Sequence, residues 1–175
     1  MKSLLQNYLL LLVFMAGFST LANGQARKKA DKATAKWEYE IECMGTGTQG
    51  SYLIKVWSFS KKPHVALEQA KKNAVHGVLF KGFTGGGNGC RSQKPLSSNP
   101  NLDQEKSGWF KDFFADGGKY MKFVALTNNG AVGPGDRIKI KKVGYKVGVI
   151  VSVRKDELRK DLENSGILKG LSSGF

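Results

Sequence analysis

Large and charged side chains alternate in residues 37–44, the first segment of the chain with the pattern of a folded domain. In residues 37–44 the large side chains alternate with three glutamates, which is typical of a half-buried strand with carboxylates on its wet face. A Gly- and Thr-rich turn follows, and residues 52–59 form a second run in which Lys55 is the sole charge. We expect an antiparallel hairpin whose second strand lies nearer the centre of the sheet.

Residues 63–80 change to a helical spacing, with Pro63 at a first-turn position. One face of the predicted helix is small and smooth and should pack closely on the sheet. The residues of that face are Ala66, Ala70, Ala74 and Gly77. On the opposite side, Glu68, Lys72 and His76 are expected to face solvent.

A long loop, residues 84–104, contains four glycines before Cys90 and then a polar stretch. Its backbone N–H groups could bind a phosphate or carboxylate with Arg91 and Lys94 nearby, as anion-binding nests do. It lacks the Gly-Lys-Ser/Thr ending of a phosphate-binding loop, and we favour a flexible loop tethered by Cys90.

A short helix is predicted from Ser107, with four aromatic residues on one face, before Gly117 and Gly118 end it. These residues are Trp109, Phe110, Phe113 and Phe114. Insertion into a membrane interface is the alternative to burial in the core. A basic face opposite the aromatics is missing, which favours burial.

The C-terminal third predicts three strands and a helix. The strands are residues 120–126, residues 137–143 with Ile138 and Ile140 inward and lysines outward, and residues 145–153, the most apolar and therefore interior strand. The helix covers residues 155–164. The fold class is α+β: a mostly antiparallel sheet of about five strands with two or three helices packed on it, in one domain over residues 37–170.

The first 24 residues have the pattern of a signal peptide. Lys2 precedes a Leu-rich run, and Ala22-Asn23-Gly24 offers small residues for cleavage before Gln25. A retained anchor is the alternative, but the apolar run is shorter than the ~20 residues that span a bilayer. We expect a periplasmic or extracellular protein without a transmembrane segment in its mature chain, with a flexible basic arm at residues 25–36 and a frayed tail at residues 171–175.

Cys43 and Cys90 are the two cysteines of the chain. In an oxidising compartment they would form one disulfide; two buried thiols, or one buried and one reactive thiol, are the alternatives. The sequence has two histidines and no CxxC or HxxxH spacing. It therefore predicts neither a metal site nor a cofactor.

Basic residues dominate the charge, with 28 Lys and Arg against 14 Asp and Glu and a formal net charge of +14. Such a field attracts anions, so we expect an acidic partner; scattered lysines that only maintain solubility are the alternative. The candidate anion-binding residues are Arg91, Lys94, Lys139, Lys141, Lys142 and Lys146.

Two segments carry a resemblance to known proteins. The Ala-rich helix Ala66–Phe80 and the run Gly144–Val153 that continues into Leu158 and Leu162 resemble small periplasmic modules of the kind found at the N-terminus of the flagellar assembly protein FlgT. The glycine loop and the aromatic helix depart from that pattern. The resemblance implies a structural or assembly role in the envelope and assigns no binding residue.

The sequence therefore predicts a non-enzymatic structural or interaction module of the bacterial cell envelope that meets an acidic partner. A secreted binder of anionic polymer (polysaccharide, lipopolysaccharide or nucleic acid) is the first alternative, using the arm at residues 27–36. A cysteine-dependent enzyme, with Cys90 as nucleophile and His64 or His76 as base, is the second. A disulfide at Cys90 would remove that nucleophile.

Overall fold

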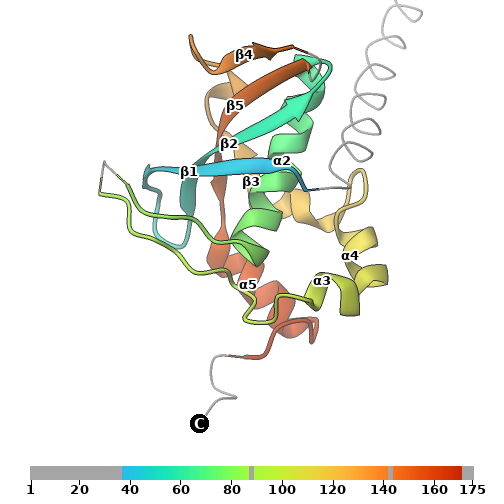
Figure 1. The fold of residues 1–175 in the computed structure, drawn as a ribbon. Coiled ribbons are helices and arrows are strands. Elements are labelled where there is room, and N and C mark those ends of the chain that lie inside the picture. The colour runs from blue at the N-terminus through green and yellow to red at the C-terminus, as the bar shows by residue number, and fades with distance from the viewer. Residues whose placement is uncertain (1–36, 87–88, 142–143, 171–175) are drawn as a thin grey trace, which may run out of the picture.

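The computed structural model describes residues 37–86, 89–141 and 144–170. They form a curled antiparallel sheet of five strands with helices packed against it, so the predicted α+β class is confirmed (Figure 1). The predicted signal peptide, the basic arm and the tail at residues 171–175 lie outside the described residues.

The elements follow one another in a simple order. They are β1 (Tyr39–Thr46), β2 (Tyr52–Ser60), α2 (Pro63–Phe80), α3 (Leu102–Glu105), α4 (Ser107–Phe113), the 3₁₀ helix η1 (Lys119–Phe123), β3 (Val124–Leu126), the 3₁₀ helix η2 (Thr127–Gly130), β4 (Arg137–Ile140), β5 (Gly144–Val153) and α5 (Lys155–Asn164). The predicted helices at 63–80 and 155–164 are confirmed, as is a helix that begins at Ser107. Among the described residues, no helix has the length and apolar character needed to cross a bilayer.

The sheet has the strand order β1-β2-β5-β3, and β4 pairs with the first part of β5. All of these pairings are antiparallel. The two most apolar strands of the sequence, β2 and β5, are therefore neighbours in the interior of the sheet, as predicted. Their inward side chains alternate with outward ones, and Val56, Val149 and Val151 are buried.

Helix α2 covers one face of this sheet (Figure 1). Ala66, Ala70 and Ala74 are fully buried, which confirms the predicted small packing face. Gly77 lies so close to β1 that a Cβ on it would collide with the Ile41 side chain. Small residues at this face allow α2 to approach the strands closely, and the hydrophobic core lies between the helix and the sheet.

A group of aromatic residues lies beside α2, where α4 meets η1. Phe113 of α4 stacks on Phe123 of η1 with ring centroids 6.3 Å apart, and Phe114 contacts Tyr120 at 5.8 Å. The predicted strand 120–126 is wrong over its first part, because residues 119–123 form η1 and only Val124–Leu126 pair with β5. The 3₁₀ turn places Tyr120 and Phe123 on one side, where both are buried against α4.

Strand β4 also differs from the prediction. Ile138, expected to point inward, is 45% exposed. Its register places it opposite Lys146, and β4 has a single neighbour, β5, at the edge of the sheet. No described helix covers this edge. The alternation of apolar and charged residues in β4 therefore predicted the burial of Ile138 wrongly.

Candidate functional site

The two cysteines form a disulfide between β1 and the glycine-rich loop. Cys43 and Cys90 are bonded across 47 positions of sequence, and the described residues contain no free thiol. The predicted pairing is confirmed. In this state neither sulfur can act as the thiolate nucleophile that a cysteine-dependent enzyme requires.

The glycine-rich loop is fastened to the body of the protein by backbone hydrogen bonds as well. Phe83 and Gln93 exchange two N–H···O bonds of 3.0 and 2.8 Å, and Leu96 donates to the carbonyl of Val78. The Gly85 N–H is bonded to Ser92 Oγ at 2.8 Å. The tether that we predicted is therefore present, and hydrogen bonds fix this part of the loop in addition to the disulfide.

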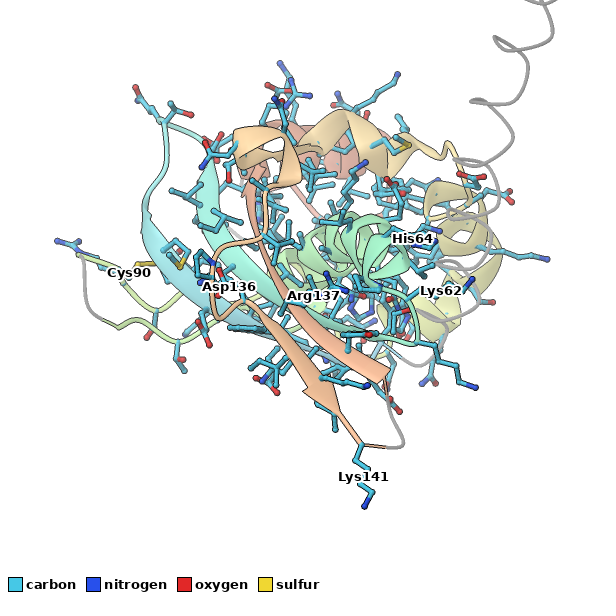
Figure 2. The ribbon with its side chains drawn as sticks, turned by 90° about the horizontal axis from the view of Figure 1, so that it is seen from above. Lys62, His64, Cys90, Asp136, Arg137 and Lys141 are labelled. Atoms are coloured by element: carbon cyan, nitrogen blue, oxygen red, sulfur yellow. A yellow bond between two sulfur atoms is a disulfide. The ribbon has the colours of Figure 1, made fainter. Side chains whose placement is uncertain are left out.

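The predicted anion-binding residues separate into two groups. Arg91 and Lys94 are exposed on the loop beside the disulfide, whereas Lys139 and Lys141 are exposed on and after β4. Figure 2 shows Cys90 and Lys141 at well-separated extremities of the molecule. Lys142 lies outside the described residues.

Lys146, the remaining candidate, is engaged on the uncovered face of the sheet. Its Nζ lies 2.7 Å from Glu40 Oε2 and 4.9 Å from the centroid of the Trp57 ring. Trp57 in turn donates a 2.9 Å hydrogen bond to Glu42 and rests against Gly148. The charge of Lys146 is thus compensated within the protein, unlike that of Lys139 and Lys141.

The fold adds two further lysines beside β4. A Cβ on Gly144 would lie 2.5 Å from the carbonyl oxygen of Ser60 and 2.8 Å from the Cα of Lys61, so the start of β5 touches the turn between β2 and α2. We call the exposed cations of these two segments the basic end. They are Lys61, Lys62, Arg137, Lys139 and Lys141.

Five cations at the basic end lack an acidic partner within the described part of the chain. The ion pairs of that part involve other cations, such as Lys55 with Asp136 at 2.9 Å and Lys119 with Asp161 at 2.8 Å. Figure 2 shows Lys141 pointing away from the body of the protein, beyond the end of β4, whereas Arg137 lies at the start of that strand. The basic end therefore presents uncompensated positive charge to solvent.

A pocket of about 460 Å³ lies between α2 and α4, and we call it the α2–α4 pocket. Its aromatic walls are Trp37, Phe80, Phe110 and Phe114. Its polar lining includes Lys72, His76, Asp103, Lys111 and Asp116. Helical periodicity did not indicate this site, because it predicts that Lys72 and His76 face solvent. That prediction is wrong: the two residues are only 3% and 5% exposed.

His76 is held in the pocket wall by two aromatic neighbours. Its Nδ1 lies 2.6 Å from the Tyr39 hydroxyl, and Trp37 stacks on the imidazole with ring centroids 3.8 Å apart and planes inclined by 15°. Burial raises the pKa of the Tyr39 phenol, which therefore stays protonated and donates to Nδ1. The ring proton of His76 is then on Nε2, a buried atom without a hydrogen-bond partner among the described residues.

Burial also determines the protonation of the two ionisable groups on this side of α2. Burial and the positive charge of Lys81 lower the pKa of His76 to about 3, so the imidazole is neutral at physiological pH. Burial lowers the pKa of Lys72 to about 8, although the Asp116 carboxylate opposes this effect. Lys72 also lies 5.6 Å from the centroid of the Tyr120 ring.

Comparison of the chain with family models, curated proteins and solved structures gives no match. A functional assignment therefore depends on the chemistry of these two surfaces, the basic end and the α2–α4 pocket.

Proposed function

We propose that this protein is a non-enzymatic interaction module, exported from the cytoplasm to the bacterial envelope or exterior, that binds an acidic partner through its basic end. The observation that carries the proposal is a set of five exposed cations without an acidic partner among the described residues. They lie on or just after β4 and in the β2–α2 turn, two segments that are distant in sequence and that approach each other where Gly144 contacts Ser60 and Lys61. Clustered charge of one sign steers an oppositely charged partner and sets its orientation.

Two other features support this role. The Cys43–Cys90 disulfide is typical of proteins that fold in an oxidising compartment outside the cytosol. The formal net charge of +14 adds a long-range attraction for any acidic surface. A partner bound in this way would be released by salt, because exposed charges are screened at moderate ionic strength.

Charge reversal at the basic end tests the proposal. The variant K139E/K141E should bind poly-L-glutamate, a model acidic polypeptide, about tenfold more weakly than the wild type at low salt. The control K160E/K169E makes the same change in net charge at two exposed lysines of the C-terminal region. Fluorescence anisotropy with labelled polymer at low and moderate salt measures both.

Equal losses in the two variants would overturn the proposal, since total charge rather than the basic end would then control binding. A parallel titration with alginate, an acidic polysaccharide, identifies the class of polymer. If alginate binds more strongly than poly-L-glutamate, and if this binding is salt-sensitive and depends on Lys139 and Lys141, the partner is an anionic polysaccharide and not an acidic protein.

A further inference from the structure

We propose that the α2–α4 pocket binds a neutral, planar aromatic compound that carries a hydrogen-bond acceptor such as an amide oxygen. This site is separate from the basic end and takes a ligand of different chemistry. Four properties of the pocket lead to this assignment: its size and walls, an unmatched donor, its balance of charge, and the backbone of Trp37.

The size and walls of the pocket favour a planar aromatic body. Its volume of about 460 Å³ is within the range of small-molecule sites, and aromatic side chains form its walls. Phe80 and Phe110 meet edge to face at 5.2 Å, and Trp37 meets Phe114 in the same way at 5.0 Å. A flat ring can add stacked or edge contacts to such a set.

The unmatched donor favours an acceptor on the ligand. His76 is 95% buried, lines the pocket and has no partner for its Nε2 atom among the described residues. A buried donor without a partner destabilises a protein, because it has lost its hydrogen bonds to water and gained none in return. An acceptor oxygen or ring nitrogen of a ligand would satisfy it, so the polar group of the ligand should lie at the His76 end.

The charges of the pocket favour a ligand without net charge. Two lysines, Lys72 and Lys111, and two aspartates, Asp103 and Asp116, contribute to its lining, and their formal charges cancel. The imidazole of His76 is neutral. A charged ligand would lose its hydration without meeting an excess of opposite charge, which is unfavourable.

The backbone of Trp37, a residue that lines the pocket, is strained. Its φ of 49° is in the left-handed region, which a bulky residue rarely adopts. Lys81 Nζ donates to the Trp37 carbonyl at 3.1 Å, and the indole is held against His76 and Phe114. Strain of this kind persists where surrounding contacts maintain it and is concentrated at binding sites.

Three probes with the same bicyclic ring separate these requirements. They are 2-naphthamide, which is neutral and has an acceptor, 2-naphthoate, which is anionic, and 2-naphthylmethylammonium, which is cationic and has no acceptor. Titration of the full chain with its disulfide intact, followed by calorimetry, should show that the amide binds about fivefold or more tightly than either ion.

Variants locate the binding in the pocket. H76F removes the donor and W37L removes an aromatic wall, and each should weaken 2-naphthamide binding about fivefold or more. H64F makes the same substitution at an exposed histidine at the start of α2 and should leave the affinity unchanged. Figure 2 shows His64 next to Lys62, at the beginning of the helix.

Three results would overturn the assignment. These are failure of 2-naphthamide to bind the wild type within its solubility, equal or tighter binding of either charged probe, and unchanged affinity in both H76F and W37L. The comparison of probes uses only the wild-type protein, so it decides the question even if a variant does not fold.

Discussion

Lys72 and His76 occupy successive turns of α2, and both are polar groups buried beside α4 and η1. An apolar side chain of similar size at either position would give a more stable protein, because it needs no hydrogen bond or counter-ion when buried. Ionisable groups in such surroundings are concentrated at functional sites. The burial of these two ionisable side chains is the main reason to regard the α2–α4 pocket as a binding site.

Protonation of His76 should make the folded state sensitive to acid. Its pKa is about 3 in the folded protein and 6.5 when exposed, so its contribution to stability is complete above pH 6.5 and is lost progressively as the pH falls toward 3. Between these limits, the wild type should lose about 1.4 kcal/mol per pH unit more than H76F. Urea denaturation from pH 7.5 to pH 4.5 measures the two slopes.

The groups that face His76 support this direction. Tyr39 on β1 is a neutral phenol, and Lys81, which directly follows α2, bears a positive charge, so neither group favours an imidazolium ion. The matched variant H64F should keep the slope of the wild type. Parallel slopes for the wild type and H76F would show that His76 is not buried in its neutral form.

At the scale of elements, Gly144 links the β4–β5 hairpin to the β2–α2 turn. It combines a φ of 121° with backbone atoms of Ser60 and Lys61 within 3 Å of the position that a Cβ would take. Both features require glycine, because another residue would be strained and would push the two segments apart. The basic end exists only while these segments stay in contact.

The substitution G144A should therefore destabilise the protein by about 2 kcal/mol or more. G108A is the matched control, since Gly108 in α4 has open space at its Cβ position and alanine favours helix. Thermal denaturation should show a lower Tm for G144A and an unchanged or slightly higher Tm for G108A. Similar Tm values for the two variants would refute the close approach at Gly144.

At the scale of the whole molecule, the disulfide joins the edge strand β1 to the loop that follows α2. Because it closes a chain segment of 47 positions, it restricts the unfolded state strongly. The double variant C43S/C90S should lose about 4 kcal/mol of stability by the chain-entropy relation. Urea denaturation of the variant and of the oxidised wild type tests this, and a difference below about 1 kcal/mol would contradict it.

The two candidate sites also differ in their relation to the whole molecule. The basic end depends on charge that is exposed at the edge of the sheet, so salt and charge reversal should control it. The α2–α4 pocket depends on burial by a second layer, α4 and η1, and should be insensitive to salt. The same fold thus presents two surfaces with separable chemistry.

The features that follow from local periodicity could be predicted from the amino-acid sequence. The face formed by Ala66, Ala70 and Ala74 identified the packing side of α2, and the apolar runs in β2 and β5 identified the interior strands. The sequence also offered a Cys43–Cys90 disulfide, with free thiols as the alternatives. It identified Lys139 and Lys141 as candidates for anion binding. These features follow from composition and spacing within a single element.

The burial of polar residues and the contacts between distant segments could not be predicted from the sequence, because they arise when the elements pack together. Periodicity describes one apolar face of a helix, so it could not show that α4 and η1 cover the opposite side of α2 and enclose Lys72 and His76. Nor could it show that Lys61 lies beside the start of β5 or that Ile138 is exposed. Such contacts depend on the packing of elements that are far apart in the chain, and local pattern does not record them.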